Sequence, residues 1–264
     1  MDLPEEDYDY GIKNVSFSEK IEFKNVSLKV NDNVVLDNIS FVVNAGESLG
    51  VIGSTGSGKS MIVYLLLGFF EATSGEILID GINIKEINKR YIREKISAIM
   101  QDSELFNMSI LDNIKIVNDD IDESSVYNAT EISSIHNEIM DFSSKYRTTV
   151  VDNGVNLSGG QKQRISIARG LLKPFEVLIL DDSLSAVDMN TDLKINNALK
   201  SMDRKFTSIF ISHRISTIAN CDNIIVMDEG KIVESGKHNE LINKNGIYSK
   251  INEIQSKEYD VNNE

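Results

Sequence analysis

The sequence lacks an apolar run long enough to cross a membrane. Its longest one, Met61 to Phe70, has ten residues, whereas a membrane-spanning helix needs about 20. Its first ten residues, MDLPEEDYDY, carry five carboxylates and no lysine or arginine, the opposite of a secretory signal. We therefore expect a cytoplasmic protein that spans no membrane by itself.

Cysteine, histidine and basic residues are also scarce. Cys221 is the only cysteine, so no internal disulfide can form, and a buried or idle thiol in a reducing compartment is expected. The three histidines, His136, His213 and His238, form no spaced ligand cluster, which disfavours a zinc site. The net charge of -14 repels phosphate backbones and anionic lipids, which disfavours nucleic-acid binding and electrostatic docking to membranes.

The organisation of the 264 residues indicates one large domain with subdomains. Residues 1–20 have no regular period and are interpreted as an acidic linker, and residues 256–264 as a polar tail that frays. The segments IEFKNVSLKV and VVLDNISFVV alternate apolar and polar residues around an Asn-Asp-Asn turn signal, which predicts an antiparallel hairpin.

The remaining pattern predicts an α/β fold. SLGVI precedes a glycine-rich loop and the apolar MIVYLLLGFF, which favours a strand, a loop and a buried helix. Five further apolar runs, EILIDG, ISAIM, FEVLILDD, TSIFIS and NIIVMDEG, alternate with helical or turn-like segments and predict a mainly parallel sheet. Amphipathic segments between residues 102 and 171 indicate an inserted helical subdomain.

A GxxxxGK[ST] motif lies between the predicted strand and helix. In such a loop the backbone N–H groups, the helix dipole and the lysine charge converge on one phosphate, and the final hydroxyl lies on Mg²⁺. A glycine-rich turn with an incidental Lys-Ser is the plainer alternative, which the flanking strand and helix disfavour. The motif consists of Gly53, Ser54, Thr55, Gly56, Ser57, Gly58, Lys59 and Ser60.

Two carboxylates, Asp181 and Asp182, follow the apolar run VLIL. The carboxyl edge of a parallel sheet is where ligands bind, although a solvated turn explains two acids equally well. Together with the phosphate loop they predict a metal site, in which Asp181 holds Mg²⁺ at the nucleotide phosphates.

Leu157-Ser158-Gly159-Gly160-Gln161 spells LSGGQ. Ser158 and Gln161 also form a capping-box pattern, but a cap does not need two glycines, whereas close approach to a phosphate does. In order, the phosphate loop, Gln101 in MQDSELF, LSGGQ, the Asp-Asp strand, Ser185-Ala186-Val187-Asp188 and Ser212-His213-Arg214 resemble the ATP-binding cassette (ABC) family over about residues 21–255.

The resemblance implies a P-loop NTPase (RecA-like) core that binds ATP and Mg²⁺. By resemblance, Gln101 senses Mg²⁺ and water near the contact with transmembrane domains, Asp188 belongs to the D-loop, and His213 contacts the γ-phosphate; by itself His213 would be a plain histidine at a strand end. Two such domains face each other head to tail, and each ATP lies between one phosphate loop and the partner's signature. The predicted signature contacts are Ser158, Gly159, Gly160 and Gln161.

QDSELF, SLSAVD, SHRISTI and GKIVESGKHNEL are most similar to the exporter branch of the family. In that branch a transmembrane domain usually precedes the ATPase in the same chain. The resemblance thus implies that residues 1–20 lead in from this domain, that residues 21–255 are an ATPase domain at the cytoplasmic face of a membrane, and that a second nucleotide-binding domain is the other partner. A soluble ABC ATPase of DNA repair or translation predicts a basic surface or a coiled-coil insertion, and the sequence has neither.

Two residues depart from the family pattern. Most exporter domains have glutamate at the position of Asp182; the shorter side chain withdraws the carboxylate by about 1 Å, which can slow hydrolysis by up to ~10²-fold. Val30 stands where an aromatic ring usually stacks on adenine, and Tyr10 or Phe17 is an alternative source of a ring. Asp182 and Val30 favour a second hypothesis, in which the chain is a weakly or non-hydrolysing regulatory half of a heterodimer rather than a self-sufficient transport ATPase.

Overall fold

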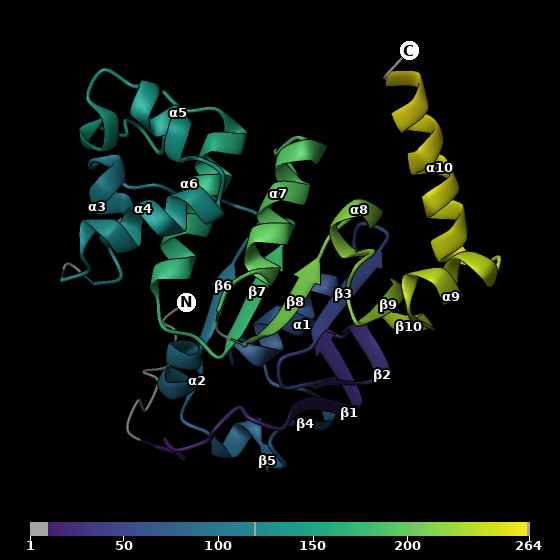
Figure 1. The fold of residues 1–264 in the computed structure, drawn as a ribbon. Helices are drawn as coiled ribbons and strands as arrows, with labels where there is room; N and C mark the ends of the chain where they lie inside the picture. Colours follow the sequence, from purple (N-terminus) through teal and green to yellow (C-terminus); the bar gives the residue numbers. More distant parts are fainter. Residues whose placement is uncertain (1–9, 119, 204, 263–264) are drawn as a thin grey trace.

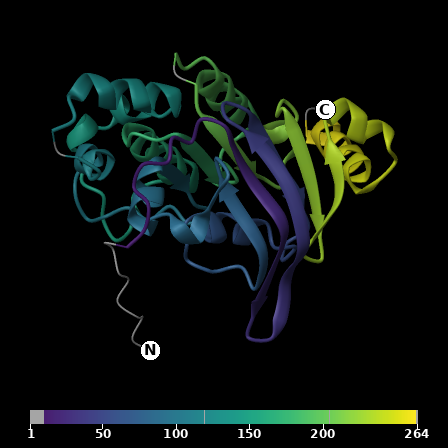
Figure 2. The ribbon, with the colours of Figure 1, turned by 90° about the horizontal axis from the view of Figure 1, so that it is seen from below.

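The computed structural model describes residues 10–118, 120–203 and 205–262. Its strands form two sheets, with orders β2-β1-β4-β5 and β10-β9-β3-β8-β7-β6 (Figure 1). Figure 2 shows helices α3 to α6 at one end of the molecule and α9 and α10 at the other. Among the described residues no helix combines the length and apolar character needed to cross a membrane.

The smaller sheet is antiparallel and contains the predicted hairpin. Asn31 and Asp32, which connect its first two strands, have φ angles of 48° and 64°, the left-handed backbone that asparagine and aspartate tolerate. EILIDG belongs to this sheet and pairs with the first strand, so this run does not join the parallel sheet. The strands are β1 (Lys20–Val30), β2 (Asn33–Asn44), β4 (Ser74–Ile79) and β5 (Ile82–Asn83).

The larger sheet is parallel except for its edge strand β10. Every residue of β7 and β8 is buried, as expected for strands covered on both faces. The fold class predicted from the sequence, a mainly parallel sheet with an antiparallel subdomain and a helical insertion, is confirmed. The strands are β3 (Ser48–Gly53), β6 (Ile96–Ile99), β7 (Val177–Asp181), β8 (Thr207–Ile211), β9 (Asn223–Asp228) and β10 (Lys231–Gly236).

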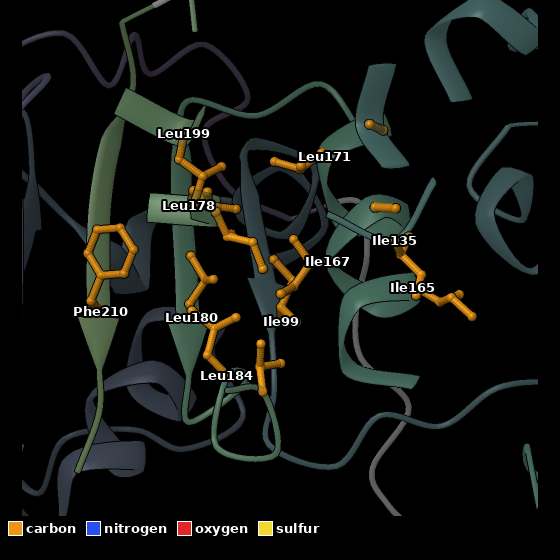
Figure 3. Packing of buried hydrophobic residues seen from close by; sticks show 14 of the residues in the cluster. Ile99, Ile135, Ile165, Ile167, Leu171, Leu178, Leu180, Leu184, Leu199 and Phe210 are labelled. Atoms are coloured by element: carbon orange, nitrogen blue, oxygen red, sulfur yellow. The ribbon is translucent and has the colours of Figure 1, made fainter. Parts of the chain in front are cut away.

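Helices cover both faces of the parallel sheet, and the strand side chains alternate between the two faces. Leu178 and Leu180 of β7 and Phe210 of β8 lie on the face that packs against α6, with Ile99 and Ile167 beside them (Figure 3). The helices are α1 (Lys59–Leu66), α2 (Lys89–Lys95), α3 (Ile110–Lys115), α4 (Glu123–Ile132), α5 (His136–Asp141), α6 (Gly159–Leu172), α7 (Met189–Lys200), α8 (Ile215–Ile218), α9 (His238–Asn243) and α10 (Ile247–Asn262), with 3-10 turns η1 (Ile84–Glu86) and η2 (Lys145–Arg147).

Three boundaries differ from the sequence prediction. The helix expected over Met61 to Phe70 ends at Leu66, because Gly68 adopts a left-handed φ of 69° and turns the chain away. The expected polar tail is helical as far as Asn262, within α10. Of the predicted linker, residues 1–9 lie outside the described residues, whereas residues 10–19 pack on the domain because Val15 is buried and Ile12 bridges to Ile87.

The single cysteine is buried, as expected from the sequence. Cys221 is 8% exposed, and burial raises the pKa of its thiol to about 12. The thiolate, which is the reactive form, is therefore absent near neutral pH.

Candidate active site

The glycine-rich loop connects β3 to α1 in a shape that needs its glycines. Gly56 and Gly58 have φ angles of 81° and 93°. A Cβ on Gly58 would lie 2.9 Å from the Val35 carbonyl oxygen, and one on Gly53 would lie 2.0 Å from the Met227 carbonyl oxygen. The loop is thus held tightly between β2 and β9, with its N–H groups at the start of α1.

Substitutions of two of these glycines separate backbone strain from steric overlap. A Cβ on Gly56 would meet no atom within 4 Å, so Gly56→Ala is expected to cost only the ~1–2 kcal/mol of a left-handed alanine. Gly58→Ala adds the contact with Val35, and we expect a further ~1–3 kcal/mol from overpacking. Urea unfolding of the nucleotide-free variants measures the difference, and equal losses would contradict this geometry.

Lys59 lies inside the loop and is 6% exposed. Its Nζ donates to the carbonyl oxygens of Gly53 (3.0 Å) and Ser54 (2.9 Å). Burial lowers the pKa of Lys59, and the charges of Asp182 and Asp181 oppose that shift. The loop therefore places the buried Lys59 amine beside two acidic side chains.

The first carboxylate, Asp181, ends β7 and is 3% exposed. Burial raises its pKa, and a hydrogen bond from Ser60 lowers it. The structure therefore brings together two of the three residues predicted to bind Mg²⁺, Ser60 and Asp181, but not Gln101. The described residues contain no group of three or more His, Cys, Asp or Glu side chains that could hold a metal, but Mg²⁺ at a nucleotide typically takes one or two protein oxygens and completes its shell with phosphates and water.

The second carboxylate, Asp182, faces His213. Its backbone adopts a left-handed φ of 45°, and its side chain is 10% exposed. Its Oδ1 accepts the N–H of His213 at 3.1 Å, and its Oδ2 lies 3.3 Å from His213 Nε2. These two residues, which the sequence assigned to hydrolysis, thus lie together after β7 and β8.

Other predicted residues are not brought into this cluster. Gln101 is exposed in the loop after β6, and among the described residues no hydrogen bond joins it to Ser60 or Asp181. Val30 ends β1 and packs, partly buried, against the core beneath the antiparallel sheet. Phe17, offered as an alternative ring, is buried with its ring centroid 6.5 Å from that of Tyr91, so its ring is covered by the core.

Tyr10, the other proposed substitute ring, is 72% exposed. Its carbonyl oxygen accepts a hydrogen bond from Asn88 at 2.7 Å, which places this part of the chain beside the start of α2. The structure gives it no contact with the phosphate loop within the described ranges.

The LSGGQ segment caps α6. Ser158 Oγ accepts from the Gln161 N–H, and Gln161 Oε1 accepts from the Ser158 N–H, which is the capping box predicted from the sequence. A Cβ on Gly160 would lie 2.9 Å from the Ala186 carbonyl oxygen, whereas Gly159 is exposed. No hydrogen bond in the described part of the chain connects this segment to the phosphate loop.

The loop from Asp182 to Asp188 is held by two side chains to which the sequence assigned no role. Gln163 accepts from the Ala186 N–H at 2.9 Å and donates to Ser185 Oγ at 3.0 Å. Arg214 donates to the carbonyl oxygens of Val187 (2.5 Å) and Ser185 (2.8 Å). Asp188 then caps α7 by accepting from the Thr191 N–H at 3.0 Å. The sequence offered one signal that could have identified Gln163 and Arg214. Each lies next to a recognised motif and carries several hydrogen-bonding atoms.

This fold and this site define an α/β domain of the P-loop NTPase class. Residues 36–185, more than half of the chain, match the family model described as "ABC transporter". The chain belongs to the ABC transporter family, and the resemblance predicted from its motifs is confirmed.

The similar proteins are exporters and B-family transporters. The chain is 43% identical over 232 residues to ABC transporter B family member 24, mitochondrial, of Arabidopsis thaliana, covering 88% of this chain and 34% of that protein. It is 37% identical over 258 residues to the ATP-dependent lipid A-core flippase of Syntrophus aciditrophicus (strain SB), covering 98% of this chain and 43% of that protein.

Among solved structures, a bacterial Atm1-family ABC exporter with ATP bound matches with a TM-score of 0.88 and 34% sequence identity. The match covers 97% of this chain and 44% of that one. The chain therefore spans less than half the length of these relatives.

Proposed function

We propose that this chain is the ATP-binding and ATP-hydrolysing motor domain of an ABC exporter, which closes head to tail with a second such domain on MgATP. The observation that carries the proposal is the convergence of Lys59, the Asp181–Ser60 pair and the Asp182–His213 pair at the carboxyl ends of β3, β7 and β8. Carboxyl ends of parallel strands are where nucleotides bind in this architecture.

The residues present fit a nucleotide and Mg²⁺. The buried hydroxyl of Ser57 has no hydrogen-bond partner among the described residues, and a phosphate oxygen would provide one. In the proposed complex the loop from Gly53 to Ser60 holds the phosphates, while Ser60 and Asp181 hold Mg²⁺ and Gln101 swings in to join them. When bound, Mg²⁺ neutralises charge between the β- and γ-phosphates.

Asp182 and His213 take the roles next to the terminal phosphate. Asp182 accepts the proton of the attacking water, since a general base must lie within hydrogen-bond reach of that proton. His213, whose side chain is 48% exposed, turns its ring to the γ-phosphate. Val30 contacts the adenine with an aliphatic surface, which gives up the ~1–3 kcal/mol that an aromatic stack contributes and loosens base selectivity.

The partner chain supplies the other half of each site. Ser158, Gly159, Gly160 and Gln161 present a helix N-terminus with two small residues, which suits close approach to a second nucleotide's phosphates. Asp188 lies in the loop that packs against Gly160 through Ala186. We propose that these residues meet the partner's nucleotide when the dimer closes.

The whole protein is proposed to be an integral membrane exporter, because its relatives are more than twice as long as the matched part. In this proposal residues 1–20 lead in from a transmembrane domain, residues 21–255 are the ATPase domain at the cytoplasmic face, and residues 256–264 follow it. The transmembrane domain of the same transporter and a second nucleotide-binding domain are the partners.

A second candidate function is the weakly or non-hydrolysing half of a heterodimer. The short Asp182 side chain favours it, because both of its oxygens lie against His213 in the nucleotide-free structure. In that role the chain binds ATP, closes, and offers an intact signature to a partner that hydrolyses.

Mixing two inactive variants tests head-to-tail closure. Lys59→Met disables the phosphate loop, and Gly159→Arg places a bulky cation at an exposed signature position that tolerates a Cβ. Neither variant forms a working site with itself, but a mixed dimer has one site with both halves intact. Since half of the dimers in an equal mixture are mixed, we expect about a quarter of the unmodified ATPase rate.

The matched controls are each variant alone at the same total concentration, together with ATP binding by Gly159→Arg. Hydrolysis in the mixture of the two variants but in neither variant alone supports closure across two chains. A mixture that stays as inactive as its components contradicts the head-to-tail arrangement.

A further inference from the structure

The side chain of Gln255, on α10, is bonded to the backbone on both sides of Arg214. Its Nε2 donates to the carbonyl oxygen of His213 at 2.7 Å, and its Oε1 accepts the N–H of Ile215 at 2.9 Å. Because a carbonyl only accepts and an N–H only donates, the two contacts fix the orientation of the amide. Gln255 therefore pairs with the backbone of residues 213–215, the switch segment, much as a neighbouring strand would.

The Ile215 N–H has little other support. It is at the start of α8, where Arg214 is the N-cap residue and provides no side-chain cap. The first N–H groups of a helix have no partner inside that helix. Gln255 thus caps α8 from a different helix, 40 residues further along the chain.

Helix α10 is firmly anchored below Gln255. The Glu234 carboxylate accepts the N–H groups of Ile247 and Tyr248 in its first turn. Tyr248 is fully buried, with its hydroxyl 2.7 Å from His238 Nδ1, and Ile251 packs against the core. Tyr248, Ile251 and Gln255 follow the three- and four-residue spacing of one helix face, so the anchored face presents the Gln255 amide to His213 and Ile215.

The contact made by Gln255 acts directly on the backbone of His213, which carries the imidazole ring. The His213 N–H is bonded to Asp182 and its carbonyl oxygen to Gln255, so the peptide groups on both sides of His213 are held. The ring itself is 48% exposed, so side-chain packing alone does not fix its position. Its direction depends on the backbone that Asp182 and Gln255 hold.

We propose that Gln255 is a positioning residue for ATP hydrolysis: it holds the His213 backbone so that the ring can reach the γ-phosphate, and it thereby makes turnover depend on the C-terminal helix. This inference rests on the function proposed above. Gln255 touches neither nucleotide nor metal, and its effect passes through His213.

Three variants of the full chain test the proposal. Gln255→Leu removes both hydrogen bonds at similar side-chain volume. Gln255→Glu keeps the acceptor for the Ile215 N–H but turns a second carboxylate oxygen to the His213 carbonyl. Lys257→Leu, an exposed position in the same turn of α10, controls for adding an apolar side chain to the helix.

Hydrogen exchange of the nucleotide-free chain tests the contact without any turnover. In Gln255→Leu we expect the Ile215 amide to exchange at least about tenfold faster, since a capped amide becomes open to water. In Gln255→Glu and Lys257→Leu its protection should be kept. Unchanged exchange in Gln255→Leu overturns the positioning role, whatever the chain does with ATP.

Steady-state kinetics test the consequence for catalysis. We expect kcat to fall by about tenfold in both Gln255 variants, as for a slightly misplaced catalytic group, while KM for ATP stays within about twofold. Loss of protection in Gln255→Leu with an unchanged kcat would mean that the contact only caps α8, and would overturn the proposal.

If the unmodified chain shows no measurable turnover, the variants are compared by the fraction of dimer that forms with MgATP, measured by sedimentation. A lower fraction in both Gln255 variants than in Lys257→Leu supports the positioning role, and equal fractions overturn it. If the unmodified chain neither hydrolyses MgATP nor dimerises with it, the proposed function itself fails. This failure is distinguishable from failure of the Gln255 contact, because the exchange of the Ile215 amide is measured without nucleotide.

Discussion

Lys59→Met is expected to lower MgATP hydrolysis by about 10²–10³-fold, the loss that follows removal of one preorganised charge or donor from a transition state. The Lys59 ammonium is buried beside Gly53 and Ser54 and faces two carboxylates, so no other cation in the described loop replaces it. Methionine retains the length and the apolar stem. Steady-state hydrolysis at saturating MgATP measures the effect.

Thermal unfolding of the nucleotide-free variant is the control for folding. Burial lowers the pKa of Lys59, which means that the folded state disfavours its charge relative to the unfolded chain; replacing it with a neutral side chain should therefore not lower Tm. Hydrolysis within a few-fold of the unmodified rate would refute the assignment of Lys59. A large drop in Tm would show that the lysine is structural.

Asp182→Glu is expected to raise kcat by as much as ~10²-fold, because one added methylene returns the carboxylate to within reach of the attacking water. In the present structure Asp182 is turned to His213, with Oδ2 at 3.3 Å from Nε2. The longer side chain can extend past the ring toward the phosphates. Single-turnover hydrolysis measures the chemical step apart from product release.

Asp182→Asn is the matched control, since it keeps the size and the acceptor for the His213 N–H but removes the base. It should lower kcat below that of the unmodified chain. No gain with glutamate would show that reach does not limit this site. Equal rates for aspartate and asparagine would identify the chain as the non-hydrolysing half of a heterodimer.

The fold class was predictable because its main signals are local. The Asn-Asp turn between β1 and β2, the strand–loop–helix around Gly53 to Ser60, and the amphipathic segments of the helical insertion each depend on a short stretch of sequence. The sequence did not show equally well which strand belongs to which sheet. EILIDG has the same apolar pattern as the parallel strands, but it pairs with β1 through long-range hydrogen bonds that no local period encodes.

The site was predictable where chemistry requires a rare spacing. GxxxxGKS and LSGGQ identify residues directly, and the structure brings Ser60 to Asp181 and Asp182 to His213. The contacts of the supporting residues were not predictable, even for Gln163, which lies next to a recognised motif. Gln163 and Gln255 are ordinary polar residues of amphipathic helices, and only the packing of α6 and α10 places them against the backbone of the D-loop and the switch.

Closure of two copies on MgATP, followed by hydrolysis, is tested by the hydrolysis rate of the purified chain as its own concentration is raised, with Lys59→Met as the blank. We expect a rate that climbs faster than in proportion to concentration, because each site needs residues from two chains. A rate strictly proportional to concentration would contradict closure between chains. A rate equal to the blank, with ATP still bound, would contradict hydrolysis by Asp182.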